Sequence, residues 1–263
     1  MTDIANKAAL ADFVKDIDRV EQLLELIQVF RDFAGQDTEL PEYARDLWIT
    51  AQNVRTDLPI LSGSLLLYLC GRFEYFVREL VSTIVDDLVD RASRYDDLPE
   101  PLRRECLART LSINQSPIKY NYTPTTASVL AGQLANNLSG QNDRDSSLQV
   151  DANIITITEV NMRPNVLADL FKRVAIERTW DTLAQQLPLQ IYLGERNERD
   201  CKKAAMTRLD DIMTERNRIA HPTGTTAFPD AKSVGEMAEY FRVLAEVLVN
   251  LARLKTMPTT DSP

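Results

Sequence analysis

The sequence predicts an all-α protein. Glycine is scarce, at 8 of 263 residues, and aromatic side chains make up only 7% of the chain. Long stretches are rich in Leu, Ala, Glu, Asp and Arg, which lose little conformational freedom in a helix. Apolar residues recur at helical spacing through most of these stretches. With 44% hydrophobic residues, the chain can bury a core, so we expect a helical bundle.

The N-terminal part, residues 1–57, is predicted to form additional helices that extend the bundle. Apolar positions at helical spacing predict a first helix over 3–33, and Gly35 suits its end. A shorter helix is predicted over 41–54, with Leu47 and Trp48 facing inward.

Residues 58–257 are predicted to form the main helical domain. Pro59 suits the first turn of a long helix that continues to about Arg94. A further helix is expected over 101–111. The segment 112–163 is rich in Asn, Ser, Thr and Gln and is interpreted as a loop-rich insertion.

Within this insertion we expect one short helix over 127–138 and a short strand over 154–158, where β-branched residues follow one another. An amphipathic helix is predicted over 201–220. Ser233 is the predicted N-cap of the last helix, and the tail 258–263 is expected to be disordered.

Composition also limits location and partners. The N-terminus lacks a signal-peptide core and no apolar run is long enough to cross a bilayer, so we expect a cytoplasmic protein with no membrane partner. The net charge is -9, and residues 1–100 hold about 20 acidic and 10 basic side chains. A nucleic-acid-binding surface is therefore expected in the second half.

Motifs narrow the chemistry to one histidine. The chain lacks a GxxxxGK[ST] phosphate loop, a GxGxxG fingerprint and a GxSxG elbow. A single histidine excludes multi-histidine metal sites, and three dispersed cysteines fit no zinc pattern. We expect no metal, no cofactor, and buried, reduced cysteines.

His221 stands at the predicted end of a helix, because Pro222 pushes it out of helical geometry. Arg216 falls on the apolar stripe of that helix, where a charge needs a partner or a functional reason. Asn217 lies four residues before His221 and can share its face. A histidine can transfer protons near neutral pH, and an arginine fork can hold a phosphate. These residues form a candidate catalytic set for cleaving RNA, whose own 2′-OH supplies the nucleophile.

A second interpretation gives the same residues no chemistry. A histidine or arginine near a helix C-terminus suits the helix dipole, and a histidine can bond the last carbonyl groups. The chain would then be a purely structural helical protein.

The segment Arg216-Asn217-Arg218-Ile219-Ala220-His221 resembles the signature of the HEPN superfamily, in which an arginine and a polar residue precede a histidine by a short spacer. The stretch 67–80 resembles the long second helix of the larger HEPN groups, particularly the RiboL-PSP-associated type. The likeness covers roughly residues 58–256, with the insertion poorly covered.

This resemblance implies a helical bundle that forms homodimers, with the two motif helices facing each other across an RNA site. It implies that Arg216 binds the phosphate, that His221 acts as acid or base, and that Asn217 orients them. It also implies a metal-independent endoribonuclease that serves as a toxin or anti-phage defence effector. Such proteins often act on tRNA and are controlled by an antitoxin or another defence-system partner.

Some HEPN members only bind, so a non-catalytic module for RNA, nucleotide or a protein partner is the alternative. Glu74 is a candidate supporting residue, whereas Arg78 and Glu79 are interpreted as solvated charges. Seven basic residues could form an RNA-facing rim or a mixed-charge surface: Lys172, Arg173, Arg178, Lys202, Lys203, Arg208 and Arg218.

Overall fold

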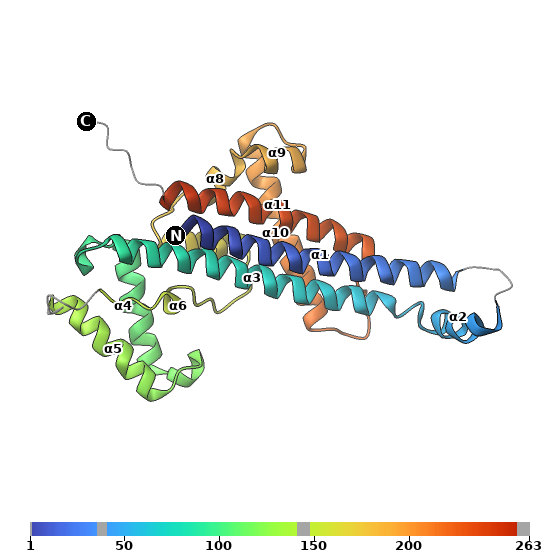
Figure 1. Cartoon of the computed structure of the whole chain (residues 1–263), viewed down its shortest axis with the longest axis horizontal. Helices are drawn as coiled ribbons and strands as arrows, with labels where there is room; N and C mark the ends of the chain where they lie inside the picture. The colour runs from blue at the N-terminus through green and yellow to red at the C-terminus, as the bar shows by residue number, and fades with distance from the viewer. Residues whose placement is uncertain (1, 36–40, 141–147, 257–263) are drawn as a thin grey trace.

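Three long helices form the centre of the molecule. The computed structural model describes residues 2–35, 41–140 and 148–256, and no strand occurs among them. Helices α1 (Thr2–Ala34), α3 (Leu58–Arg91) and α11 (Ala231–Thr256) lie side by side along the long axis (Figure 1). The predicted all-α class is confirmed.

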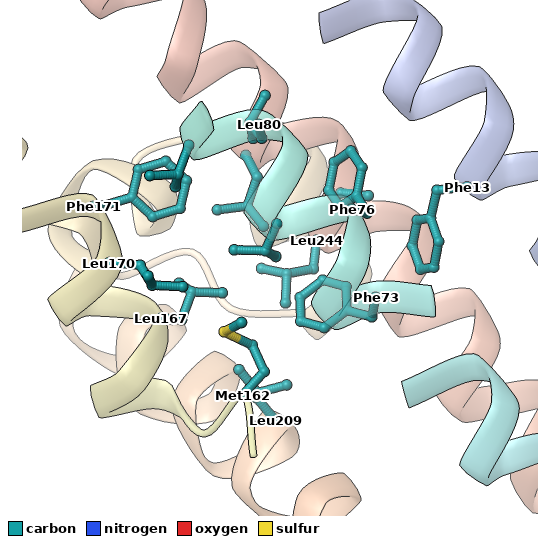
Figure 2. Packing of buried hydrophobic residues seen from close by; sticks show 14 of the residues in the cluster. Phe13, Phe73, Phe76, Leu80, Met162, Leu167, Leu170, Phe171, Leu209 and Leu244 are labelled. Carbon is teal, nitrogen blue, oxygen red and sulfur yellow. The ribbon is translucent and has the colours of Figure 1, made fainter. Parts of the chain in front are cut away.

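The core of the bundle is rich in phenylalanine. Phe13 of α1 stacks on Phe76 of α3 at 5.1 Å between ring centroids, and Phe73 of α3 lies 4.5 Å from Phe241 of α11. Figure 2 shows Phe13, Phe73 and Phe76 near buried leucines such as Leu244 of α11. Aromatic pairs in such geometry add to the stabilisation from burial alone. They fix α1 and α11 against α3.

The remaining helices of the domain surround this core. Helix α10 (Glu198–Ala220) runs across α3, and α2 (Glu42–Val54) lies at the far end of the bundle (Figure 1). Three shorter helices pack near α10: α7 (Pro164–Arg173), α8 (Thr179–Ala184) and α9 (Leu187–Leu193).

The insertion contains more helix than expected. Helix α4 (Glu100–Gln115) packs against α5 (Pro124–Ser139), and two short 3-10 helices, η1 (Tyr95–Asp97) and η2 (Pro117–Tyr120), flank α4. The strand predicted over 154–158 is wrong. Asp151 accepts a hydrogen bond from the backbone of Asn153 and caps a short helix, α6 (Ala152–Ile155), whose isoleucines are buried.

Two local predictions are also wrong. Leu47 is 54% exposed, because α2 packs mainly against α1 and presents this residue to solvent. The last helix begins earlier than expected, since the Asp230 carboxylate accepts a hydrogen bond from the Ser233 backbone and takes the capping role assigned to Ser233. The predicted tail, 258–263, lies outside the described residues.

Helix α1 belongs to the core rather than lying beside it. Phe13, Ile17 and Val20 are buried, and ion pairs join Asp18 and Glu21 to Arg242 of α11. Residues 1–57 therefore contribute a central helix to the bundle as well as the peripheral α2.

Helix α3 is long and apolar enough, by length and composition, to cross a membrane. The expectation that no apolar run is long enough to cross a bilayer is therefore wrong for α3, by length and composition. In this fold the apolar face of α3 is packed against α1, α10 and α11. The core helix of a helical bundle can have the same length and apolar composition as a membrane-spanning helix.

One buried polar side chain in the core, the amide of Asn6, is expected to lower the stability of the fold. Asn6 of α1 is fully buried, and neither its amide nitrogen nor its amide oxygen has a hydrogen-bond partner. Such a group keeps its desolvation penalty. We expect Asn6→Leu to raise the free energy of unfolding by about 1 kcal/mol in urea denaturation. Asn53→Leu on the exposed face of α2 should change it by less than about 0.5 kcal/mol. A less stable Asn6→Leu protein would contradict the prediction.

Candidate functional site

The predicted motif lies at the C-terminal end of α10. The helix ends at Ala220, and His221 has φ −126° and ψ 65°, outside helical geometry. The His221 backbone N–H still donates to the carbonyl of Asn217 at 3.1 Å, so the last turn is closed. Pro222 then directs the chain into the loop that leads to α11, as the sequence predicted.

This loop is fixed by a notch in α3. Gly63 of α3 is buried, and a Cβ atom placed on it would lie 2.7 Å from the Phe228 ring and 3.4 Å from Ile219. Only a residue without a side chain lets the loop and the end of α10 approach so closely. Gly63 therefore helps to set the position of the helix end that carries His221.

Arg216 lies half-buried beside the middle of α3. Burial raises the pKa of the Cys70 thiol to about 12, while the positive charge of Arg216 acts in the opposite direction, which places the guanidinium near this turn of α3. Nη1 of Arg216 donates to the side-chain oxygen of Asn217 at 3.3 Å. No carboxylate among the described residues lies within ion-pair distance of Arg216.

Asn161 joins the motif from the insertion. Its side-chain nitrogen donates to Oδ1 of Asn217, the same oxygen that accepts from Arg216. The sequence analysis missed Asn161. It lies 56 positions from Asn217, and no local pattern marks it.

The segment around Asn161 is held in place by several contacts. Arg173 donates to the carbonyl oxygens of Ile155 and Ile157 at 2.7 and 2.9 Å. Met162 is fully buried near Leu209 (Figure 2). Arg163 forms an ion pair with Asp210 of α10. These contacts leave Asn161 little freedom to move away from Asn217.

Glu74 supports the same segment rather than Arg216 directly. Oε1 of Glu74 accepts from Arg78 at 2.6 Å and from the hydroxyl of Thr158 at 2.9 Å. Arg78, interpreted from the sequence as a solvated charge, instead pairs with Glu74 and donates to the Thr158 hydroxyl.

Arg216, Asn217 and Asn161 form a polar cluster. His221, four residues after Asn217 in the sequence, is exposed at the surface. Within the described part of the chain, its imidazole makes no hydrogen bond. Among these residues the imidazole therefore does not bond the last carbonyl groups of α10, and its place at the helix end still suits the helix dipole.

Four of the seven residues of the predicted basic rim form ion pairs. Arg173 is only 8% exposed and pairs with Asp169 and Glu105, so it is a structural residue. Lys202 and Arg178 both lie near Asp181. Arg218 pairs with Glu215. Lys172 is exposed. Lys203 and Arg208 line a cavity of about 620 Å³ beside α9 and α10, together with three acidic residues: Glu195, Asp200 and Asp211.

These features define a class of protein: a helical bundle with a polar cluster where the end of one helix meets the long central helix. The model of the RiboL-PSP-HEPN family matches residues 17–254. This range covers most of the sequence, so the chain belongs to the RiboL-PSP-HEPN family. No curated protein and no solved structure matched the chain. The match begins within α1, in agreement with the packing of that helix in the core.

The notch at Gly63 predicts opposite effects for two glycines of α3. Gly63→Ala should force Phe228 out of place and lower the free energy of unfolding by about 1–3 kcal/mol. Gly71 has open space around its missing Cβ, so Gly71→Ala should raise it by about 0.5–1 kcal/mol. Urea denaturation of both variants measures the difference. Equal effects at the two positions would show that the notch does not constrain the loop.

The reactivity of the three cysteines tests whether the interior around them is closed to solvent. Cys70, Cys106 and Cys201 are buried and unpaired, as expected from the sequence, and burial raises the pKa of each thiol. Since the thiolate is the reactive form, the native protein should be inert to a thiol reagent at pH 8. After unfolding, three thiols per chain should react. Rapid labelling of Cys70 in the native protein would mean that the turn beside Arg216 opens to solvent.

Proposed function

We propose that this protein is a metal-independent endoribonuclease in which Arg216 binds the scissile phosphate. One observation carries the proposal. Arg216 is half-buried, yet its one side-chain hydrogen bond within the described residues goes to the neutral Asn217. Two other arginines on or against α10, Arg218 and Arg163, are instead paired with carboxylates. Arg216 therefore retains N–H donors for an anion, and a guanidinium fork suits phosphate oxygens.

The reaction needs no external nucleophile. The ribose 2′-oxygen attacks phosphorus, the bond to the 5′-oxygen breaks, and a 2′,3′-cyclic phosphate and a free 5′-hydroxyl result. One proton leaves the 2′-OH and one reaches the departing 5′-oxygen. His221 is suited to either transfer, and Arg216 offsets the charge that develops on the phosphate oxygens.

Asn217 and Asn161 act on Arg216 rather than on the substrate. Oδ1 of Asn217 accepts from both Arg216 and Asn161. This shared acceptor holds the guanidinium in one orientation. An oriented fork loses less freedom when it binds the phosphate, which favours the transition state.

The need for both an acid and a base in the reaction favours a homodimer as the active form. Cleavage uses one acid and one base, and each chain has one histidine. A second copy facing the end of α10 would supply the other imidazole, and the exposed position of His221 leaves it available to a second chain.

The proposed biological role is that of a toxin or an anti-phage defence effector that cleaves cellular RNA, including tRNA. Such an activity would arrest growth, which fits a toxin or an anti-phage defence effector. It would require control by an antitoxin or another partner protein. Growth arrest on expression, relieved by His221→Ala, is the outcome that this role requires.

A second candidate function is a non-catalytic module that binds RNA, nucleotide or a protein partner. The pairing of Arg218, Lys202 and Arg173 with carboxylates favours it, because RNA binding gains from unpaired positive charge. It predicts a stable complex without turnover, with equal binding by wild type and His221→Ala.

The catalytic assignment predicts a specific ranking of variants in a cleavage assay with cellular RNA in EDTA. Arg216→Ala should reduce the rate at least about 100-fold, because the phosphate loses its cation. His221→Ala should reduce it by about 10²–10⁴. Arg218→Ala is the matched control, since Arg218 lies on the same turn but is exposed and paired with Glu215. It should change the rate by about twofold or less.

Circular dichroism and thermal melting would establish that all three variants are folded. Equal activity of Arg216→Ala and Arg218→Ala would contradict the role of Arg216, and undiminished cleavage by His221→Ala would contradict the role of His221.

A further inference from the structure

A groove lies between the last turns of α3 and helix α5, at the end of the molecule opposite α2 (Figure 1). Its volume is about 450 Å³, within the range of about 300–1,000 Å³ that ligand pockets span. Three segments of the chain give it an apolar lining: Val89, Val129, Leu130, Leu148 and Val150. Leu130 is almost fully buried, whereas Val129 is 54% exposed. Asp151 is the one charged side chain among the described residues that line the groove.

Hydrogen bonds fix the two walls of this groove relative to each other. Asn137 of α5 donates to the backbone carbonyl of Gln149 at 2.8 Å, and Gln133 donates to the side-chain oxygen of Gln149 at 3.0 Å. Two residues further on, Asp151 caps α6, whose isoleucines are buried in the core. The segment 148–151 is therefore held against α5, and the groove is already formed in the free protein.

The charges around this groove are acidic. Helix α5 has no charged residue, and the segment that forms the facing wall has only Asp151. The last turns of α3 add Asp86 and Asp90, which are exposed and, within the described residues, form no ion pair. The arginines of α4 and of the last turn of α3 are already paired with carboxylates: Arg91 with Asp87, Arg103 with Asp96, Arg104 with Glu100 and Arg109 with Glu105.

Asp86 stands at the edge of the groove, one turn before Val89 on the same side of α3. Partial burial raises the pKa of the Asp86 carboxyl, and the negative charges of Asp90, Asp151 and Glu79 raise it further. A cation bound here would reduce this repulsion, whereas a phosphodiester backbone would add to it. No three of these carboxylates are placed to hold a metal ion in the part of the chain that the structure describes. The cations that fit are therefore the side chains of another protein.

We propose that this groove binds a partner protein through a segment that places apolar side chains against Val129 and Val150 and Lys or Arg side chains beside Asp86 and Asp90. Apolar anchors at the centre and charges at the rim are the usual division of a protein interface. The wall of the groove continues through α6 to Asn161, so the bound partner would touch the insertion that supports the candidate site. The inference rests on the proposed function only for the need of a controlling partner, because docking itself does not require RNA cleavage.

The test selects short random-sequence peptides, displayed on phage, that bind the immobilised full-length protein. Soluble Val129→Asn protein is present as competitor, so that peptides bound elsewhere are removed. The enriched peptides should combine apolar residues with Lys or Arg. The leading peptide is then labelled with fluorescein, and its affinity for each variant is measured by fluorescence anisotropy.

Neutralising the rim tests the charge of the partner. Asp86→Asn combined with Asp90→Asn should weaken binding of the peptide about fivefold and reduce its dependence on salt, because two exposed ion pairs are lost. Glu42→Gln combined with Asp46→Asn is the matched control, since these acids of α2 have the same spacing and are also exposed. This control should leave the affinity unchanged.

A control on α5 separates the groove from the rest of that helix. Leu138 is 58% exposed and lies nine residues after Val129, which places it on the opposite side of α5. Leu138→Asn should therefore bind the peptide as the wild type does, whereas Val129→Asn should not.

The proposal would be overturned if no peptide survived the competition with Val129→Asn, or if the enriched peptides were acidic or uncharged. Equal affinity of the wild type and the neutralised rim would also overturn it. So would a dimer that is lost in sedimentation of Val129→Asn but kept in Leu138→Asn, because a second copy would then cover the groove. Failure of the proposed function is separate: a protein that cleaved no RNA would still bind the peptide.

Discussion

The aromatic contacts between α1, α3 and α11 hold the three central helices together, and α10 with its candidate site packs against one of them, α3. Phe73 and Phe76 of α3 meet Phe13 of α1 and Phe241 of α11, with centroid distances of 4.5 to 5.9 Å. These rings are almost fully buried, and their removal would open large cavities in a densely packed interior. Because α1 and α11 occupy two sides of α3, a third side remains for the end of α10. The notch at Gly63 then sets how closely α10 and its following loop approach.

The candidate site is assembled from segments that are distant in sequence but held independently. Helix α10 supplies Arg216 and Asn217, and its abrupt end places His221 outside helical geometry. The insertion supplies Asn161, whose position depends on the buried Met162 and on the carbonyl contacts of Arg173. Each support is a buried or ion-paired group, so the polar cluster does not rely on flexible surface side chains. This rigidity favours a site that binds a phosphate without first reorganising.

The helical class and most helix positions could be predicted from the sequence, because they depend on local periodicity. The Pro222 stop likewise predicted that α10 ends at His221, whereas the catalytic role of the motif residues stays a prediction. The sequence-based prediction misplaced features that depend on tertiary contacts. The run at 154–158 has strand-forming residues, but no neighbouring strand is available and Asp151 caps a helical turn there instead. Arg173 looked like a surface cation, yet its partners are carbonyl groups brought close only by folding. Asn161 and the Gly63 notch are visible only when the distant segments meet.

The central claim is that RNA is cleaved through its own 2′-OH at the Arg216 and His221 cluster. The most direct measurement is the chemistry of the fragment ends, obtained by mass spectrometry after incubation of wild-type protein with an RNA in EDTA. The RNA would then be resynthesised with a single 2′-deoxy nucleotide at the mapped cleavage position. The account predicts 2′,3′-cyclic phosphate or its hydrolysed form on the first RNA and no cleavage at that position on the second. Fragments that end in a 3′-hydroxyl, or cleavage that persists at the deoxy position, would contradict it.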